Sequence, residues 1–341
     1  MGSVKDLEIL KEPGETYMGE GVFIFSDRYS VFDWGEMPDL IPKKGEAIAI
    51  LGAYFFEKLE TQGFKTHYIG ILDGKDIKRL EDLDHPSNKM VVNLVREIRP
   101  RLKNDGSYDY SIFKTLKSTF LIPLEVIYRN YLPPGSSVFK RLKEGSITFK
   151  DLGLEKYPEP GEKLNSPLID FSTKLEITDR YLSLSEAQEI SGLSDEEMKE
   201  LVDMVFKVNE IISKEFEKIG LVNQDGKFEF GFDPDRKLMF VDVLGTLDEC
   251  RFVWNDIPVS KEIARMYYRK TKWYEDVEEA KKINRQKWKE ICKSKPDPLP
   301  KRLKELISKI YQACTNEITE REWFKGTGSL KSLLEEVKEF I

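Results

Sequence analysis

The stretch that most constrains the fold of this 341-residue chain is residues 225–251. It contains two runs of alternating apolar and polar residues, separated by the turn-rich segment Asp233-Pro-Asp-Arg236. Alternation with a period of two is typical of a strand, and two such runs around a Pro-containing turn predict a β-hairpin. We expect Lys227 and Glu229 to share one face of this hairpin, with Asp242 near the end of the second strand opposite them.

The charged face of this hairpin has two interpretations. Acidic side chains brought together from paired strands, beside a lysine, suit a hard divalent cation that bridges the phosphates of a nucleotide. An ordinary hairpin with a solvated charged face has about the same weight on spacing alone. The spacing therefore leaves a nucleotide site and a plain surface both open.

The residues of this stretch also resemble a known family. Asp225-x-Lys-x-Glu-Phe-Gly231, followed by Asp242, Asp248 and Arg251, is similar to the signature of phosphoribosylaminoimidazole-succinocarboxamide synthase, the SAICAR synthetase of purine biosynthesis. Further similar segments follow in the same order: Ile41-Pro-Lys-Lys-Gly45, residues 122–130 with Gly135-Ser136, and Ser172-Thr-Lys-Leu-Glu176. The resemblance extends over roughly residues 20 to 255, and several ordered motifs are more specific than one short motif.

Two departures from the family pattern concern the nucleotide site. The family commonly has Asp-Glu where this chain has Asp242-Val243, so one acid is missing. Alternation along a strand would turn residue 243 away from residue 242. The family's Gly-Lys-x-Lys loop over the ATP phosphates is not clear either. The available pieces are Lys11, Gly14, Gly19 and Gly21, and a plain hairpin turn is the favoured interpretation of them.

The resemblance implies an α+β, two-lobed fold of the SAICAR synthetase type, similar to kinase and ATP-grasp folds. A small antiparallel N-terminal lobe would stand over a larger mixed lobe. We expect a nucleotide-binding lobe at residues 1–120, a substrate- and metal-binding lobe at 121–258, and a helical C-terminal appendage at 259–341. Two lobes also agree with the chain length, because single cores stop growing at about 250–300 residues.

Roles for individual residues also follow from the resemblance. Glu229 and Asp242 would hold Mg²⁺ and, with Lys174 and Lys227, form the catalytic set; Lys174, Glu229 and Asp242 would also contact ATP. Backbone groups near Phe120 and Leu121 would meet the adenine. The substrate-binding residues expected from the family motifs are Lys44, Glu125, Arg129, Gly135, Ser136, Asp225, Asp248 and Arg251.

The function that the resemblance implies is an ATP-dependent carboxylate–amine ligase. Carboxyaminoimidazole ribonucleotide and L-aspartate would be condensed to SAICAR, with release of ADP and phosphate, in de novo purine biosynthesis. One alternative is a related ATP-dependent ligase or kinase that acts on another phosphorylated substrate. The other is a noncatalytic paralogue that binds a nucleotide.

Composition excludes several other classes of function. The net charge of −7 offers no general attraction to nucleic acid or to anionic membranes. With three cysteines in no ligand-like spacing, neither a disulfide framework nor a zinc site is indicated. We expect a cytoplasmic protein with small-molecule substrates, no nucleic-acid or membrane partner, and a homo-oligomer contact as one possible use of the appendage. His67 and His85, its two histidines, are expected to be structural.

Three scaffold elements can be predicted from periodicity. Apolar residues at helical spacing follow the 41–45 motif and predict a helix through about residue 59. The apolar run from Met90 predicts a buried strand, with residues 119–128 as its expected partner. Residues 182–219 predict a helix, with Ser194 and Glu197 placed as a capping box.

Overall fold

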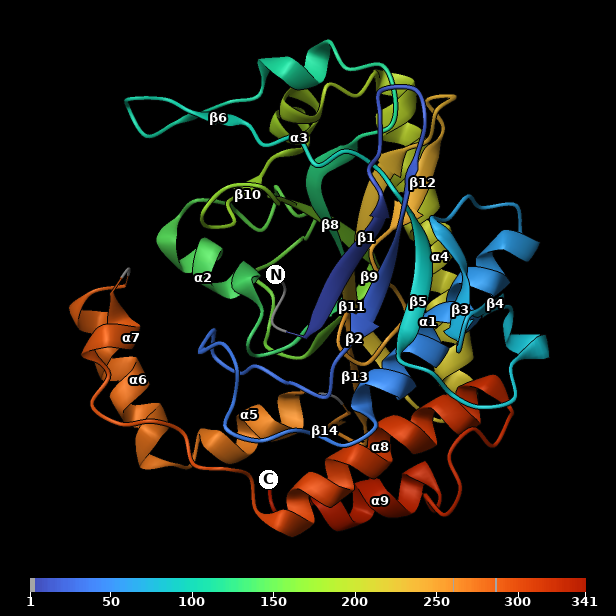
Figure 1. Ribbon diagram of the computed structural model, residues 1–341. Helices are drawn as coiled ribbons and strands as arrows, with labels where there is room; N and C mark the ends of the chain where they lie inside the picture. The colour runs from blue at the N-terminus through green and yellow to red at the C-terminus, as the bar shows by residue number, and fades with distance from the viewer. Residues whose placement is uncertain (1–3, 260, 286) are drawn as a thin grey trace.

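Residues 4–259, 261–285 and 287–341 are described by the computed structural model, in which two antiparallel sheets carry most of the strands (Figure 1). The first sheet has the order β1-β2-β5-β3-β4. Its strands are β1 Lys5–Lys11, β2 Gly19–Phe25, β3 Tyr68–Asp73, β4 Asp76–Lys78 and β5 Lys89–Leu94. Helix α1, Lys44–Thr61, packs against β2, β3 and β5 of this sheet.

The second sheet has the order β10-β9-β8-β11-β13-β14, and β12 pairs with β11 beside that path. Helix α4, Asp195–Lys218, packs on β8 and β11. The strands are β8 Leu121–Leu132, β9 Glu162–Thr173, β10 Tyr181–Leu182, β11 Val222–Phe232, β12 Leu238–Val241, β13 Cys250–Trp254 and β14 Ile257–Pro258.

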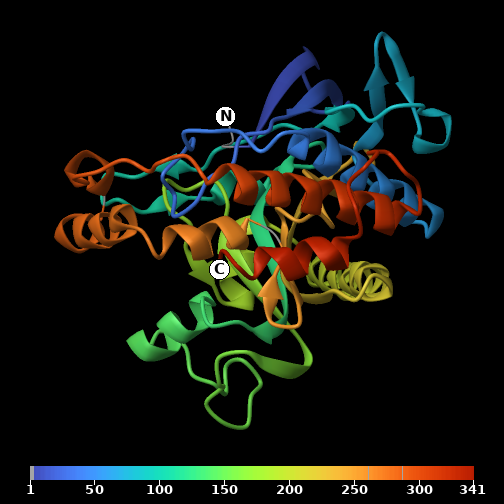
Figure 2. The same cartoon turned by 90° about the horizontal axis from the view of Figure 1, so that it is seen from below.

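Smaller elements connect and surround the two sheets. The connection between β5 and β8 carries a two-stranded ribbon, β6 Arg101–Leu102 and β7 Tyr108–Asp109. Two short helices, α2 Ser137–Glu144 and α3 Leu184–Ser191, flank the second sheet. The helices near the C-terminus are α5 Glu262–Tyr268, α6 Lys272–Ile283, α7 Trp288–Ile291, α8 Lys301–Thr319 and α9 Leu330–Val337. Figure 2 shows α8 running beside α1.

The segment between α1 and β3 joins the two sheets. The Phe240 N–H on β12 donates to Lys65 O at 3.0 Å, and the His67 N–H donates to Phe240 O at 2.9 Å. One continuous cluster of buried apolar residues includes residues of both sheets and of α8 and α9. Within it Phe216 stacks on Phe55 of α1 and on Phe252 of β13, with ring centroids 5.8 Å and 3.7 Å apart. The predicted lobes therefore share one core, and their limits stay a prediction.

Local patterns predicted several elements correctly. The hairpin of residues 225–251 is confirmed as β11 and β12, which pair with Glu229 opposite Val241. The helix after the 41–45 motif is confirmed as α1. The capping box is confirmed as well: the Ser194 side chain accepts from the Glu197 N–H, and the Glu197 carboxylate accepts from the Ser194 N–H.

The predicted pairing of the Met90 strand is wrong. β5 lies between β2 and β3 in the first sheet, whereas residues 121–132 form β8 of the second sheet, between β9 and β11. Residues 95–120 cross from one sheet to the other, and the two segments meet only at an isolated bridge between Arg96 and Phe120. Strand periodicity reports that a segment is extended, and it carries no information on which strand lies beside it.

The single helix predicted for residues 182–219 is also wrong, because it is two helices. α3 ends at Ser191, and its C-cap residue Gly192 adopts a left-handed conformation at φ 67°. A β-carbon at Gly192 would lie 2.4 Å from Phe113 O, so glycine is required there for space as well as for conformation. Helix α4 then restarts after its own Ser194 cap.

The start of α1 is held by the loop that precedes it. The Asp27 carboxylate accepts from the N–H groups of Lys43 and Gly45, at 3.1 Å and 3.0 Å, which satisfies donors that a helix N-terminus leaves open. Gly45 lies so close to β2 that a β-carbon on it would be 2.5 Å from Phe25 O. The 41–45 motif is thus shaped by close backbone packing.

We expect Gly45→Ala to lower the free energy of unfolding by about 1–3 kcal/mol, because a backbone oxygen cannot move aside as a flexible side chain can. Urea unfolding would measure the loss. Gly135→Ala is the control, since nothing lies within 4 Å of its added β-carbon. Equal losses in the two variants would contradict the packing argument.

Candidate active site

The core of the candidate site is a set of charged side chains on β11 and its neighbours. Glu229 on β11 lies directly opposite Glu125 on β8. Lys227 lies on the same face, and its Nζ is 3.0 Å from Glu229 Oε1 and 3.2 Å from Glu125 Oε1. The prediction that Lys227 and Glu229 share a face is confirmed. The lysine offsets the repulsion between two carboxylates held across neighbouring strands.

Glu229 receives a second cation from the end of β9. The Lys174 Nζ lies 2.5 Å from Glu229 Oε1, and the Glu229 side chain is only 5% exposed. Burial would raise the pKa of Glu229, but Lys227 and Lys174 outweigh it and lower that pKa to about 2. Glu229 is therefore ionised at neutral pH, as a cation ligand must be.

Asp242 is paired with Lys5, a residue that the sequence analysis missed. Lys5 lies at the start of β1, and its ammonium forms an ion pair with the Asp242 carboxylate across the two sheets. Burial lowers the pKa of Lys5 to about 8, and Glu249 and Glu229 oppose that shift.

The pieces considered for a phosphate loop lie at the other end of β1 and β2. Gly14 O and Glu15 O there accept from the Thr119 hydroxyl, at 2.8 Å and 2.7 Å. The favoured interpretation of these glycines as a hairpin turn agrees with that placement. No sequence pattern singled out Lys5 or linked it to Asp242.

A further carboxylate in this group, Glu249, was also missed. Its Oε2 lies 3.5 Å from Lys227 Nζ, and the Glu249 side chain is 13% exposed.

Val243, which stands where the family commonly has an acid, is buried beside Gly52 of α1; a β-carbon added to Gly52 would lie 3.2 Å from Val243 Cγ1. Residue 243 does point away from the site, as expected. Strand alternation is not the reason, because β12 ends at Val241 and Asp242 has a left-handed backbone at φ 63°.

The ion pairs of this group, which we call the lysine–carboxylate cluster, join three lysines to four carboxylates. Its members are Lys5, Lys174, Lys227, Glu125, Glu229, Asp242 and Glu249. The cluster thus carries one negative charge in excess. Polyphosphate could take over the lysines and leave the carboxylates to a divalent cation, which is the exchange a nucleotide site requires.

Arg129 on β8 is the centre of a second group of charges. Only 2% exposed, it donates through Nε to Asp170 Oδ2 at 3.1 Å and through Nη1 to Asp225 Oδ2 at 3.4 Å. Arg251 on β13 donates through Nε to Asp225 Oδ1 at 2.7 Å. Arg141 of α2 pairs with Asp170 as well. We call these residues the arginine network.

The predicted Gly135-Ser136 turn lies beside the arginine network. Ser136 caps α2, where its hydroxyl accepts from the Val138 N–H, and the Ser136 Oγ is 3.5 Å from Arg129 Nη1. Gly135 is exposed in the turn just before it. Arginine side chains, a serine hydroxyl and a helix N-terminus are donors that suit a phosphate monoester.

Lys44 and Asp248 form a buried ion pair. Lys44 Nζ lies 2.7 Å from Asp248 Oδ2, with side-chain exposures of 1% and 5%. Asp248 Oδ1 accepts from the Tyr311 hydroxyl of α8 at 2.6 Å. Burial would raise the pKa of Asp248, but Lys44 and Lys261 outweigh it and keep that pKa below its usual value. Substrate contact by Lys44 or Asp248 stays a prediction, since the pair lies inside the protein.

Two backbone groups in the predicted adenine region already have partners within the fold. The Leu121 N–H donates to Arg96 O at 2.9 Å, and Phe120 O accepts from the Phe232 N–H at 3.0 Å. To form a hydrogen bond here, adenine would have to donate to the second lone pair of Phe120 O or use a neighbouring backbone group. The role of Phe120 and Leu121 therefore stays a prediction.

His67 supports the backbone at Asp242. The ring is buried and its Nε2 lies 2.8 Å from Asp242 O, so Nε2 must carry the hydrogen because a carbonyl oxygen only accepts. Burial and the nearby Lys5 lower the pKa of His67 to about 3, so the imidazole is neutral. The structural role expected for this histidine agrees with these contacts.

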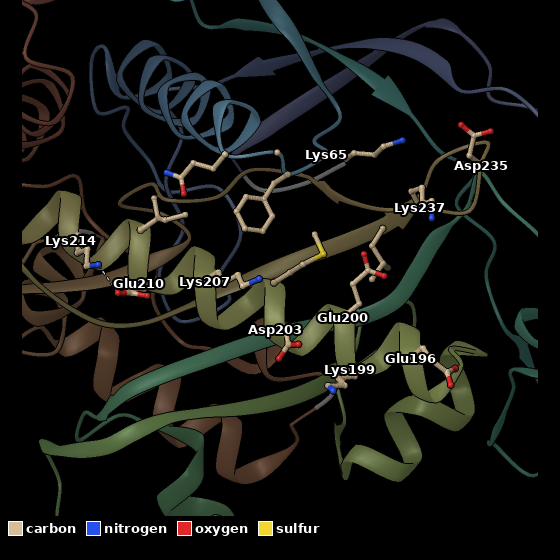
Figure 3. Close-up of a pocket in the computed structure, with 16 residues that line it drawn as sticks. Lys65, Glu196, Lys199, Glu200, Asp203, Lys207, Glu210, Lys214, Asp235 and Lys237 are labelled. Carbon is tan, nitrogen blue, oxygen red and sulfur yellow. Dashed lines mark ion pairs between the residues drawn. The ribbon is translucent and has the colours of Figure 1, made fainter.

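A hollow of about 990 Å³ lies elsewhere on the molecule (Figure 3). It is bordered by α4, the segment after α1 and the β11–β12 turn, and contains none of the predicted site residues. Lysines and acids alternate around it, including Lys65, Lys207, Glu200 and Asp203. Within residues 4–259, 261–285 and 287–341, no group of three or more His, Cys, Asp or Glu side chains could hold a metal ion.

The two antiparallel sheets are linked by the Lys5–Asp242 ion pair, and the arginine network lies on the second sheet. These features define the class as a two-lobed α+β protein with a charged site. The family model described as SAICAR synthetase matches residues 14–291. The chain belongs to the SAICAR synthetase family, which confirms the resemblance seen in its motifs.

Relatives in the same family cover nearly the whole chain. One from Archaeoglobus fulgidus, named provisionally as a phosphoribosylaminoimidazole-succinocarboxamide synthase, is 51% identical over 341 residues, with 100% of each chain covered. The phosphoribosylaminoimidazole-succinocarboxamide synthase of Thermoplasma acidophilum is 34% identical over 332 residues, which are 94% of this chain and 98% of the relative.

Solved structures share the fold. A SAICAR synthetase (Type-2) in complex with ADP has a TM-score of 0.56 at 24% identity, covering 87% of this chain and 99% of its own. The SAICAR synthase from Saccharomyces cerevisiae complexed with SAICAR has a TM-score of 0.65 at 20% identity, covering 95% and 94%. The predicted α+β, two-lobed fold is thereby confirmed. No helix in the described part of the chain is long and apolar enough to cross a membrane.

The pKa of His67 predicts a pH dependence of stability. The unfolded chain takes up this proton near pH 6.5 and the folded protein near pH 3. The stabilisation is therefore complete above pH 6.5 and declines as the pH falls toward 3, by up to about 1.4 kcal/mol per pH unit.

We expect His67→Gln to reduce the loss of unfolding free energy per pH unit between pH 6.5 and 3, as measured by urea unfolding at several pH values. His85→Gln is the control, because His85 is exposed. A slope that persists unchanged in His67→Gln would show that other groups cause it.

Proposed function

We propose that this chain is an ATP-dependent ligase that condenses carboxyaminoimidazole ribonucleotide with L-aspartate to SAICAR, releasing ADP and phosphate. The observation that carries the proposal is the lysine–carboxylate cluster beside the arginine network, in a chain of the SAICAR synthetase family. The ADP and SAICAR complexes of the structural neighbours support the same pair of ligand types.

The chemical difficulty of the reaction is that a carboxylate resists attack by an amine. ATP overcomes it by converting one carboxylate oxygen of the ribonucleotide into a phosphate leaving group, which the amine of aspartate then displaces. The protein must neutralise the phosphoryl group during transfer. Lys5 of β1, Lys174 directly after β9 and Lys227 of β11 would do so, with Glu229 and Asp242 in the same catalytic set.

Mg²⁺ fits the carboxylates of the cluster. Glu229 and Asp242 are hard oxygen donors held by lysines that phosphate can displace. Magnesium is usually bound by one or two carboxylates together with substrate phosphates, so a site with fewer than three protein acids suits it. When bound, Mg²⁺ supplies positive charge to the transferring phosphate. Its binding by these residues is part of the proposal.

The arginine network would receive the phosphate of the ribonucleotide. Arg129 and Arg251 both hold Asp225, so phosphate would share or replace that carboxylate as their partner. Ser136 and the turn at Gly135 would add donors. Glu125 and Asp248 would orient ring or ribose groups, with Lys44 behind Asp248.

Phe120 and Leu121 would line the adenine site, and residues 259–341 would supply any homo-oligomer contact. The two alternative functions, a related ligase or kinase and a noncatalytic nucleotide-binding protein, are outcomes of the experiment below. A cytoplasmic location agrees with soluble small-molecule substrates.

The first experiment measures ADP release with magnesium, ATP and carboxyaminoimidazole ribonucleotide, with and without L-aspartate. We expect turnover that needs both substrates and falls by ~100-fold or more in Glu229→Ala, because that change removes a charge from the reacting site.

Turnover without aspartate dependence would favour the related ligase or kinase. Folded protein without turnover, but with ADP binding, would favour the noncatalytic protein.

Lys5 provides a second test of the same site. We expect Lys5→Met to lower kcat by about 10²–10³-fold, the size of effect seen when one group that stabilises transition-state charge is removed. Lys11→Met is the matched control, because Lys11 lies at the opposite end of the same strand and is exposed. Loss of activity in Lys11→Met with retention in Lys5→Met would reverse the assignment.

A further inference from the structure

One face of α8 contacts both motif segments that border the site. Ser308 donates to Pro42 O at 2.6 Å, Tyr311 to Asp248 Oδ1 at 2.6 Å, and Thr315 to Ala47 O at 3.1 Å. These three residues follow a spacing of three and four, which places them on one side of a helix. The helix runs beside α1 in Figure 2.

Tyr311 is the one of these three that reaches a predicted site residue. The Asp248 carboxylate is almost fully buried, and its two oxygens have different partners: Lys44 pairs with Oδ2, and Tyr311 donates to Oδ1. Lys261 donates to the backbone oxygen of Asp248 at 3.0 Å. A buried carboxylate needs donors on both oxygens, because each one left unpaired carries a large desolvation cost.

Asp248 lies in the turn at residues 246–249, which leads into β13 and lies between the two charged groups of the site. Thr246 O accepts from the N–H groups of Glu249 and Cys250, at 3.2 Å and 3.0 Å. On one side of Asp248, the Glu249 carboxylate reaches Lys227. Three residues after Asp248, Arg251 reaches Asp225 in the arginine network. Asp248 thus precedes Glu249 directly and lies three residues before Arg251, whose backbone also pairs with Asp225 of β11.

We propose that α8 is a positioning element of the active site, in which Tyr311 fixes Asp248 and thereby aims Glu249 at Lys227 and Arg251 at the substrate phosphate. Tyr311 itself would touch no substrate. The helix lies beyond residues 14–291, the part matched by the family model. The appendage would thus be required for the geometry of the reaction as well as for the core.

This inference rests on the proposed function, and Tyr311→Phe tests it by removing one hydroxyl. We expect the KM for carboxyaminoimidazole ribonucleotide to rise about tenfold, less than the ~100-fold that a 1 Å misplacement can cost. The KM for ATP should change less, because Lys5, Lys174 and Lys227 keep their ion pairs with Asp242 and Glu229, which lie outside this turn. A purely structural role would lower the folded fraction, which reduces apparent kcat and leaves both KM values as they were.

Thr315→Val is the matched control. Thr315 lies on the same face of α8 and is also buried, but its hydroxyl donates to the backbone oxygens of Ala47 and Tyr311 and makes no contact with Asp248. Hydrogen exchange at the Glu249 and Cys250 amides gives a readout without turnover. We expect faster exchange in Tyr311→Phe than in the wild type, and wild-type rates in Thr315→Val.

The outcomes separate the two proposals. Absence of wild-type turnover would overturn the proposed function, while the exchange measurement would still test the positioning of the turn. Unchanged exchange in Tyr311→Phe, an unchanged KM for the ribonucleotide in an active enzyme, or equal effects of Thr315→Val would each overturn the role of Tyr311. ADP affinity, measured by calorimetry on each preparation, verifies that the variants are folded.

Discussion

The register of β11 against β8 sets Glu229 opposite Glu125, and the rest of the site depends on this pairing. Two carboxylates across neighbouring strands repel each other, and near-complete burial of Glu229 strengthens the need for positive charge. Lys227 supplies that charge from the same strand, and Lys174 supplies it from β9. The pairing between Lys5 and Asp242 extends the same principle across the two sheets.

The near balance of charge in the lysine–carboxylate cluster has a chemical consequence. Each lysine is held by a carboxylate in the protein alone, so the ammonium groups are positioned before any phosphate arrives. Pre-positioned charge avoids the reorganisation that would otherwise raise the barrier. The arginine network follows the same design, because Asp225 and Asp170 hold Arg129 in place. Both groups combine buried charges with partners that an incoming anion can replace.

The C-terminal helices are integrated with this arrangement. The core is continuous from the first sheet to α9, so the appendage is packed as part of the main body. Contacts of α8 with Pro42, Ala47 and Asp248 reach both the start of α1 and the 246–249 turn. Residues of α8 therefore contact motif segments that lie more than 200 and more than 60 residues earlier in the chain.

The sequence by itself determined the hairpin, helix α1 and the Ser194 capping box, because each depends on residues close together in the chain. It also placed Lys227 and Glu229 on one face, since alternation along a strand relates residues two apart. The family motifs determined the fold class.

The tertiary structure alone decided that Lys5 meets Asp242, that Glu249 joins the cluster while Val243 enters the core, and that Tyr311 holds Asp248. It also decided that β5 pairs with β2 and β3 rather than with β8. The physical reason is common to all of these. Periodicity describes how a segment is folded locally, whereas a contact between distant segments depends on how the sheets and helices pack, which no local pattern encodes.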